Sequence, residues 1–287
     1  MKIIAHENEI EIAGISDFDL AKTFECGQCF RWNADENGIY TGIAFGLAAK
    51  VRRRGGSIFI SGSLENFNKI WRNYFDLDRD YAKIRKQLCV DGFMRQATDF
   101  GTGIRILKQD KWEVLCSFIT SQNNNIPRIK SIIDTLCREF GNAVWFEEKQ
   151  LYTFPSAETL EKVEAHHLAP LRCGYRAEYI IRTARAIANG TIDLDALSQN
   201  SPDAARTALK KLHGVGDKVA DCVMLFGLHK LDAFPIDVWM KRAVAQHYGT
   251  DFDPVIFSPY AGIAQQYIFH YMREKQTTPA DVKKDCN

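Results

Sequence analysis

Lys218 and Asp237 are the two residues of this sequence best suited to covalent chemistry. Lys218 opens an almost wholly apolar run, KVADCVMLFG, and Asp237 precedes another helical run, VWMKRAV. A lysine in the first turn of a buried helix faces the positive end of the helix dipole, and apolar neighbours disfavour its ammonium form. Both effects favour the neutral amine, which is the nucleophilic form. A surface lysine with its stem along apolar side chains is the alternative, and the lysine alone does not decide between them.

The chain between these two residues is long enough to bring them together. A helix of about 11 residues spans about 16 Å, and about eight extended residues reach about 26 Å, so the chain can return to the helix start. Asp237 also suits a simple helix N-cap. A carboxylate beside a neutral amine is suited to nucleophilic substitution at an electron-poor carbon.

The turn HGVGD joins two predicted helices, SPDAARTALKKL and DKVADCVMLFG. Two helices joined by a glycine-containing turn form a helix–hairpin–helix unit, in which Asp217 is expected to cap the second helix. Gly214 and Gly216 permit positive φ and close approach, and the unpaired N–H groups at the helix start favour anions such as phosphate. An ordinary helical hairpin with a glycine cap fits the same spacing, so both interpretations stay open on spacing alone.

Two regions of different pattern must position these residues. Residues 1–100 contain short alternating runs with Gly or Asn-Gly turns, which are typical of strands and hairpins, followed by two helical runs. Residues 101–287 repeat amphipathic helices and short loops, among them SAETLEKVEAHHL, and several begin with Ser or Asp. We therefore predict an α+β protein in which an N-terminal antiparallel sheet domain (1–100) packs on a larger helical domain (101–287).

Composition excludes several classes of protein. The 287 residues carry a net charge of +1, so a polyanion would be met by a local patch or by backbone groups rather than by overall charge. No apolar run approaches the roughly 20 residues that cross a bilayer, and the N-terminus has neither a secretory nor a transit pattern. The eight cysteines are scattered, which fits a reducing compartment, and the pair Cys26 and Cys29 has no partner pair with metal-ligand spacing.

Several motifs together resemble a known family. LHGVGDKVADC and FPIDVWM resemble the catalytic core of the helix–hairpin–helix DNA glycosylases. The segments CGQCFRW (26–32), SQNNNIPRI (121–129), CGYRAEYI (173–180) and SPYAGIAQQYIF (258–269) narrow the resemblance to the 8-oxoguanine DNA glycosylase/lyase family. The resemblance implies an α+β fold with a helical glycosylase domain, and an enzyme that removes 8-oxoguanine opposite cytosine from duplex DNA. It implies no cofactor and no side-chain metal site.

The same resemblance implies the chemistry of the pair. Lys218 would attack C1′ of the damaged nucleoside, expel the base and form a Schiff base with the opened sugar. Asp237 would stabilise the cationic sugar as the bond breaks. The lysine would then permit β-elimination at the abasic site, which makes the enzyme both glycosylase and lyase. The expected partner is double-stranded DNA with oxidised guanine, and the protein is expected to be a monomer that meets no membrane. The expected location is intracellular: cytoplasmic (nucleoid) in a bacterium or nuclear in a eukaryote.

The base must leave the stack to be reached, so the enzyme needs a pocket for the flipped base. The resemblance implies four positions that form this pocket. By resemblance, Cys222 and Phe269 sandwich the base, and Gln265 reads its Watson–Crick edge. The carbonyl of Gly27 would accept the extra N7–H that distinguishes 8-oxoguanine from guanine. Taken singly, these residues would be read as ordinary members of a core or of a surface helix.

Further positions are implied to contact DNA outside the pocket. Asn123 would fill the gap left by the flipped nucleotide, and Arg128 would hydrogen-bond the estranged cytosine. Tyr175 would wedge beside the opposite strand, with Arg176 as its companion at the estranged base. The hairpin would bind the DNA backbone through Gly214 and Gly216, and a monovalent cation is implied on the carbonyls of Lys210, Leu212 and Val215.

The sequence departs from the family pattern in two places. Trp239 stands where the family commonly has histidine, so the phosphate contact there falls to an indole with a single N–H donor. Cys26 and Cys29 stand where serine is common, and thiols beside the pocket would make activity sensitive to oxidants. The basic run KVRRRGG (50–56) lies outside the matched motifs and is interpreted as a solvated hairpin face.

Two other functions stay open. One is a helix–hairpin–helix glycosylase for another lesion, although enzymes for alkylated purines commonly lack the lysine. Enzymes for oxidised pyrimidines or mispaired adenine carry a terminal cysteine cluster that this sequence lacks. The other is a non-catalytic DNA-structure binder that uses the same hairpin, against which the presence of both Lys218 and Asp237 argues.

Overall fold

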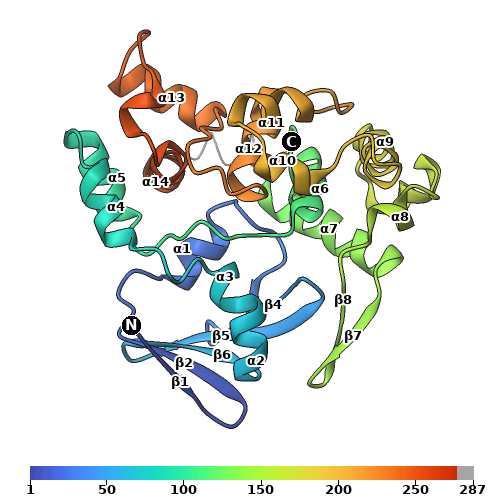
Figure 1. Ribbon diagram of the computed structural model, residues 1–287, viewed down its shortest axis with the longest axis horizontal. Helices are drawn as coiled ribbons and strands as arrows, with labels where there is room; N and C mark the ends of the chain where they lie inside the picture. The colour runs from blue at the N-terminus through green and yellow to red at the C-terminus, as the bar shows by residue number, and fades with distance from the viewer. Residues whose placement is uncertain (277–287) are drawn as a thin grey trace.

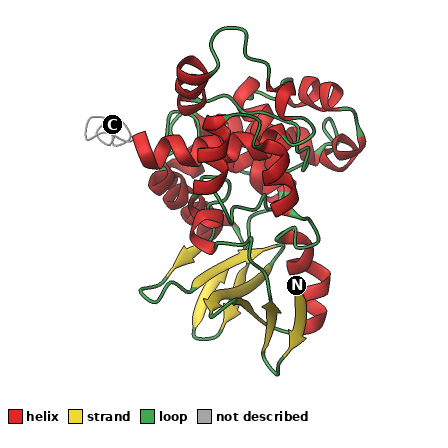
Figure 2. Cartoon of the chain, turned by 90° about the vertical axis from the view of Figure 1, so that its left-hand side faces the viewer, coloured by secondary structure: helices red, strands yellow, loops and turns green. Residues whose placement is uncertain are grey.

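The computed structural model describes residues 1–276, and the predicted domain range 101–287 extends beyond them. An antiparallel sheet forms one end of the molecule and a larger body of helices forms the other (Figure 1, Figure 2). This confirms the predicted α+β architecture. The sheet has the strand order β1-β2-β6-β5-β4-β3. Its strands are β1 (Lys2–Ala5), β2 (Glu9–Ala13), β3 (Asn33–Ala34), β4 (Tyr40–Ala44), β5 (Leu47–Arg54) and β6 (Ser57–Ser61).

Alternation of apolar and polar residues gives this sheet one buried face. In β2 and β6 the isoleucines are buried and face one another across the ladder, with Ile10 opposite Ile60 and Ile12 opposite Ile58. Side chains two apart in a strand share a face, so this spacing fixes the register. The buried face packs against α1 (Leu20–Glu25) and the segment formed by α2 (Leu64–Asn66), a π-helical turn (Phe67–Trp71) and α3 (Arg72–Tyr74).

The basic run 50–56 lies in β5 and its turn to β6, as interpreted from the sequence. Arg52 forms an ion pair with Glu9 on β2 at 2.7 Å, and Arg53 donates to the carbonyl of Phe18 at 2.6 Å. Two of its cations are therefore engaged within the sheet domain.

The helical part buries its apolar faces in a second core. Most of its helices begin at an Asp, Asn or Ser whose side chain accepts from the first turn, as the predicted caps require. No helix of the described chain is long and apolar enough to cross a membrane. The helices are α4 (Tyr81–Leu88), α5 (Gly92–Phe100), α6 (Lys111–Thr120), α7 (Ile126–Phe140), α8 (Ala157–Leu160), α9 (Arg176–Ala188), α10 (Leu194–Gln199), α11 (Pro202–Leu209), α12 (Asp217–Phe226), α13 (Val238–His247) and α14 (Ala261–Gln276).

One predicted helix is wrong. The run SAETLEKVEAHHL forms only the short α8 and then, after a turn, a 3₁₀ segment (Ala165–Leu171). The helix already ends at its C-cap, Glu161, and Glu164 has the extended angles φ −97° and ψ 155°, so the break precedes the 3₁₀ segment. A small hairpin of β7 (Ala143–Phe146) and β8 (Lys149–Tyr152) precedes α8, and the sequence analysis did not predict it.

The segment 26–29 joins the sheet domain to the helical domain. Gln28 is 0% exposed, and its side-chain amide donates to the carbonyl of Arg105 at 2.7 Å and accepts from the N–H of Leu107 at 2.9 Å. On the other side, Gln266 of α14 donates to the carbonyl of Cys26 at 2.8 Å. Both faces of this segment are thus hydrogen-bonded to helical-domain residues, which fixes the backbone at Gly27.

Candidate active site

The hairpin between α11 and α12 takes the predicted form, with different tasks for its two glycines. Gly214 has φ +81°, and a Cβ there would lie 2.1 Å from the Tyr179 ring. Gly216 has the extended angles φ −90° and ψ −174° and caps α12, and a Cβ there would meet nothing within 4 Å. Gly214 is therefore required by the fold, whereas Gly216 leaves open space in front of the helix start.

The predicted cap of α12 is wrong by one residue. Gly216 is the N-cap, because its carbonyl accepts the first helical bond from Ala220 at 2.9 Å. Asp217 lies in the first turn instead, and its exposed carboxylate pairs with Lys210 at 2.6 Å. Lys218 therefore still lies in the first turn of a largely buried helix, as the chemical argument needs.

The amine of Lys218 lies in a defined setting at the junction of α12 and α6. Its Nζ donates to Oγ of Ser121 at 3.3 Å and lies 5.1 Å from the centre of the Phe118 ring. Both partners belong to the C-terminal end of α6. Neither was singled out from the sequence, since nothing distinguishes one Ser or Phe of an apolar helix from its neighbours.

Asp237 and Lys218 lie in the walls of the same cavities, as predicted from the length of chain between them. Asp237 is the N-cap of α13 and accepts from the N–H of Met240 at 2.9 Å. Burial raises the pKa of its carboxyl, against the opposing effects of that N–H and of the charge on Lys218. The site thus holds a partly desolvated carboxylate near an amine.

The residues predicted to bind a flipped base surround a small cavity of about 60 Å³. Gln265 is 4% exposed, and its Oε1 has no hydrogen-bond partner among the described residues. A buried acceptor without a partner costs free energy, so the side chain is suited to receive a donor from a ligand. The cavity adjoins one of about 420 Å³ with which it shares Gly27, Phe118, Lys218, Asp237 and Phe269, and its own wall adds Cys222.

The thiols near this pocket are poorly suited to oxidation. Burial raises the pKa of Cys26 to about 11 and also raises that of Cys29 well above its ordinary value. Since the thiolate is the form that oxidants attack, both side chains stay in the less reactive form at neutral pH. The expected oxidant sensitivity is therefore not supported by their surroundings.

Asn123 and Arg128 line a separate cavity of about 680 Å³, together with Gly216, Trp239 and Lys218. Asn123 has φ +47°, an uncommon left-handed angle for a residue other than glycine, and its amide lies 3.4 Å from the hydroxyl of Tyr175. Arg128 donates to the carbonyl of Arg172 at 3.2 Å. The structure therefore places two of the residues predicted at the opposite strand beside the predicted nucleophile.

Arg176 is buried against the loop that carries Asn123. It is 7% exposed, and its guanidinium donates to the carbonyls of Gln122 and Cys173 and, at 3.0 Å, to that of Asn123. Its charge also lies 4.6 Å from the centre of the Tyr175 ring. In this structure Arg176 therefore holds the loop that carries Asn123.

The indole of Trp239 lines the two larger cavities of the site. The guanidinium carbon of Arg242, one turn later, lies 4.8 Å from the centre of the ring. An arginine at this distance from an indole face forms a cation–π contact. Trp239, at the position where the family commonly has histidine, therefore lies against the positive charge of Arg242.

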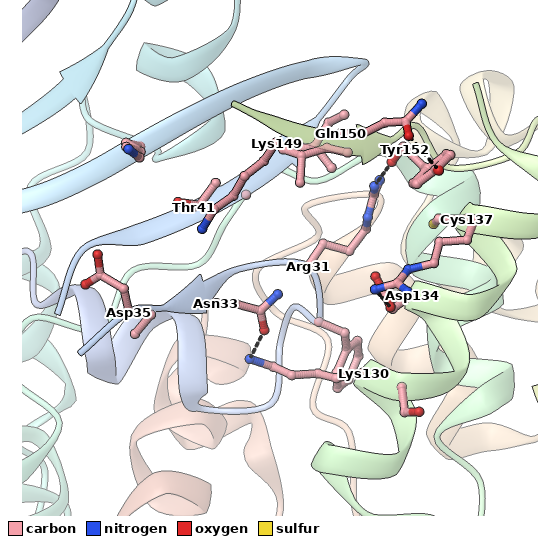
Figure 3. A pocket seen from close by; sticks show the side chains of 18 residues that line it. Arg31, Asn33, Asp35, Thr41, Lys130, Asp134, Cys137, Lys149, Gln150 and Tyr152 are labelled. Carbon is pink, nitrogen blue, oxygen red and sulfur yellow. Dashed lines mark hydrogen bonds and ion pairs between the residues drawn. The ribbon is translucent and has the colours of Figure 1, made fainter. Parts of the chain in front are cut away.

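A cavity of about 940 Å³, larger than those around Lys218, lies elsewhere. It is formed by β4, α7 and β8, and Figure 3 shows Lys130 reaching Asn33 and Arg31 reaching Tyr152 around it. No residue predicted to act on a base lines it. No group of three or more His, Cys, Asp and Glu side chains suited to a metal ion occurs among the described residues.

Two family models match consecutive parts of this chain. Residues 12–115 match the family model of the 8-oxoguanine DNA glycosylase N-terminal domain, and residues 116–255 match that of the HhH-GPD superfamily base excision DNA repair proteins. The N-glycosylase/DNA lyase of Saccharomyces cerevisiae is 34% identical over 259 residues, which cover 81% of this chain and 69% of that protein. The probable N-glycosylase/DNA lyase of Methanothermobacter thermautotrophicus is 29% identical and covers 90% of this chain and 95% of its own length.

Solved structures with a similar fold include one with DNA bound. The Clostridium acetobutylicum 8-oxoguanine glycosylase/lyase, in complex with double-stranded DNA containing cytosine opposite 8-oxoguanine, is 37% identical with a TM-score of 0.92. The match covers 96% of this chain and 99% of that one. MBOgg1 in complex with a low-affinity DNA ligand is 43% identical, also with a TM-score of 0.92, and covers the same shares.

Proposed function

Because this chain belongs to the 8-oxoguanine DNA glycosylase family and is a bifunctional N-glycosylase/DNA lyase of base excision repair, we propose that it removes 8-oxoguanine opposite cytosine through a Schiff base on Lys218. One observation carries the proposal. Lys218 and Asp237 share a cavity with Gln265, a buried side chain whose acceptor has no partner among the described residues. The side chains of an amine, a carboxylate and a buried amide with a free acceptor therefore line one cavity among the described residues.

In the proposed reaction, the neutral amine of Lys218 attacks C1′ of the lesion nucleotide. The bond from C1′ to the base breaks, its electron pair leaves with the base, and the base takes up a proton. Asp237 stabilises the positive charge that develops on the sugar, and its partly desolvated setting strengthens this interaction. The resulting aminal opens to a Schiff base, and loss of a proton from C2′ then expels the 3′ phosphate, which cleaves the strand.

Lesion recognition is proposed to depend on a backbone carbonyl and a side-chain amide. The carbonyl of Gly27 would accept the N7–H of 8-oxoguanine, whereas guanine has an acceptor at N7 and would be repelled. Gln265 would read the Watson–Crick edge, with Cys222 and Phe269 on the two faces of the base. The cavity of about 60 Å³ is smaller than a base, so the side chains around it must move on binding.

The opposite strand and the backbone would be bound from the other cavity. Arg128 offers a planar set of donors that suits the acceptors of cytosine, and Asn123 lies at the same wall. The N–H groups at the start of α12, in front of Gly216, suit a phosphate of the lesion strand. Arg176 at the estranged base and a monovalent cation on the hairpin carbonyls stay predictions.

A borohydride trapping assay tests the proposal. The wild-type protein is incubated with a duplex that carries 8-oxoguanine opposite cytosine, and reduction should fix a covalent complex with DNA. The variant Lys218→Gln should bind the duplex without forming this complex, whereas Lys162→Gln, which changes an exposed lysine far from the hairpin in sequence, should trap like wild type. Binding by the wild type without any trapping would favour the non-catalytic DNA binder.

The opposite-base assignment has its own test. Excision rates are measured for 8-oxoguanine opposite each of the four bases, and cytosine should give the highest rate. The variant Arg128→Ala should reduce the preference for cytosine by about 10- to 100-fold, because it removes a bidentate base contact. Equal wild-type rates opposite cytosine and adenine would contradict the role proposed for Arg128.

A further inference from the structure

We propose that Ser121 is a positioning residue that fixes the direction of the Lys218 amine. The proposal rests on the proposed nucleophilic role of Lys218 and extends it to a residue of another helix. Ser121 is the C-cap of α6, and its backbone N–H donates to the carbonyl of Ser117 at 2.9 Å. The serine is therefore held at the end of a buried helix rather than on a free loop.

The hydroxyl of Ser121 has its proton already engaged. It donates to the carbonyl of Phe118 at 2.8 Å, and a serine hydroxyl has one proton and two lone pairs. Toward Lys218, 3.3 Å away, it can therefore act only as an acceptor. This polarity is set by α6 itself, since the carbonyl that takes the proton belongs to the last turn of the same helix.

A fixed acceptor orients the nucleophile. A neutral amine has two N–H bonds and one lone pair, and substitution requires the lone pair to point at C1′. If Ser121 accepts one N–H while the face of Phe118 lies against the amine, rotation at the end of the lysine side chain is limited. A positioned reactant group contributes to rate because less freedom is lost on reaching the transition state.

The position of Ser121 fits this task. It lines both the cavity of about 420 Å³ next to the base pocket and the cavity of about 680 Å³ on the opposite-strand side. Lys218 and Asp237 also line both cavities. The contact of Ser121 with Lys218 thus lies where the sugar of the flipped nucleotide would cross between them, so the serine can act on the amine without contacting the base.

The variant Ser121→Ala tests the proposal, with Ser121→Thr as the variant that keeps a hydroxyl. Ser121→Ala should lower the single-turnover rate of base excision by about tenfold, the effect of one lost hydrogen bond, and leave duplex affinity unchanged. Borohydride trapping on a preformed abasic site should slow equally, because base recognition is then bypassed. Ser121→Thr should restore most of the rate. Ser117→Ala, one turn earlier on α6, should behave like wild type.

The pH–rate profile separates this role from a general loss of structure. An accepting hydroxyl also favours the ammonium form, so its removal should shift the acidic limb of the Ser121→Ala profile to lower pH. Asp237 from α13, Cys222 from α12 and Cys26 also line the cavities around the amine, and all three are unchanged in the variant. A shifted limb together with a lower maximum would support the proposal.

Two results would overturn it. A wild-type rate and profile for Ser121→Ala would show that the contact has no role in the reaction. A slower rate with an unshifted profile and a lowered melting temperature would assign the effect to the stability of α6. The proposed function fails differently, because a wild-type protein that cannot be trapped on DNA leaves no Lys218 intermediate to be positioned.

Discussion

Asp237 caps α13 and lines the same cavities as Lys218, so one carboxylate is proposed to serve both the helix and the reaction. Asparagine caps helices about as well as aspartate but carries no charge. We expect Asp237→Asn to be at least as stable as wild type and to lose most excision activity. Asp237→Ala should lose activity too and should be about 1 kcal/mol less stable than Asp237→Asn, because the cap is absent. Urea unfolding and single-turnover excision measure the two effects.

The same residue predicts a pH dependence of stability. Burial raises the pKa of Asp237 above its ordinary value of 3.8, so the folded protein keeps this proton to higher pH than the unfolded chain does. Between the two values the folded state binds more protons, and stability therefore falls as pH rises through that window. The difference in unfolding free energy between wild type and Asp237→Asn should grow from pH 3.5 to pH 7. A constant difference would contradict the cause assigned here.

The two residues proposed to react stand out in the sequence because their types are unusual for their places. A lysine at the start of a buried helix and the aspartate of FPIDVWM are informative by themselves. Ser121 is not, because its importance comes from the direction of one hydroxyl proton. For Arg176, the motif predicts the region of the site in which it lies. It does not predict that backbone carbonyls, among them that of Asn123, accept hydrogen bonds from its guanidinium.

At the scale of elements, the two glycines of the hairpin predict different outcomes for the same substitution. Gly214→Ala should destabilise the protein by at least about 1 kcal/mol, because of its positive φ and the clash with Tyr179. Gly216→Ala should leave stability within about 0.5 kcal/mol, because its backbone is extended and its surroundings are open. It should still weaken binding of lesion duplex, because the new methyl group lies where a phosphate would approach.

Thermal melting and duplex titration, carried out on both variants, separate these effects. If Gly216→Ala melts well below wild type, the turn requires glycine at this position for stability despite the open space around it. If it binds DNA like wild type, the hairpin does not contact the backbone at this point. Gly214→Ala serves as the matched substitution, since it adds the same methyl group two residues earlier.

Regular elements were predictable where apolar spacing and caps agree, and the exceptions have physical causes. β2 and β6 follow from alternating isoleucines, and α7 from its asparagine cap and apolar stripe. The β7–β8 hairpin is not apparent from the sequence because each strand has only four residues and β7 (AVWF) is apolar throughout, so its alternating exposure leaves no pattern in residue type. The cap of α12 was misplaced because glycine can cap a helix through its backbone alone.

At the scale of the whole molecule, a buried ion cluster ties the two domains together. Asp76 is 3% exposed and pairs with Arg79 at 2.5 Å and Lys108 at 3.1 Å; the imidazole of His229, whose pKa burial lowers, lies 3.7 Å away. His229 follows α12, so the cluster reaches from the sheet domain to the helix that carries Lys218. Burial alone would raise the pKa of Asp76, but these partners more than offset it, and the pKa lies well below its ordinary value.

This cluster predicts how the protein responds to acid. A carboxyl with a lowered pKa stabilises the fold fully above the unfolded value near 3.8, and this contribution is lost as pH falls below it. Asp76→Asn should cost about 3 kcal/mol at pH 7 and should flatten the loss of stability below pH 4. Asp78→Asn removes an exposed partner of Arg72 and should cost less than about 0.5 kcal/mol. Equal costs for the two variants in urea unfolding would contradict this account.

The side chain of Gln28 joins the two domains through buried hydrogen bonds. Gln28→Ala leaves the buried carbonyl of Arg105 and the N–H of Leu107 without their partner, which should cost about 2–4 kcal/mol. Because Gly27 is its neighbour, the ratio of excision rates for 8-oxoguanine over guanine should also fall. The control is Gln150→Ala, which changes an exposed glutamine of β8. An unchanged ratio despite lower stability would separate Gln28 from lesion recognition.

The general architecture was predictable because each domain has its own apolar pattern. The contact between residues 26–29 and α14 was not, because the two segments are far apart in the chain and join mainly through backbone carbonyls. Patterns of side chains carry no information about such bonds. The resemblance to a family predicts that the two segments lie at one pocket. The structure shows which atoms form the hydrogen bond between them.

Gly27 and Phe269 line the same pocket but are synthesised at very different times. A Cβ on Gly27 would lie 3.5 Å from the Phe269 ring, although Phe269 follows Gly27 by 242 positions in the chain and therefore leaves the ribosome much later. Domains tend to fold in the order of their emergence. A nascent chain that ends before α14 already carries the hairpin and the amine, but it has no pocket to select a base. The proposed base selectivity is therefore acquired only after α14 has been made, and chains terminated before α14 would lack it.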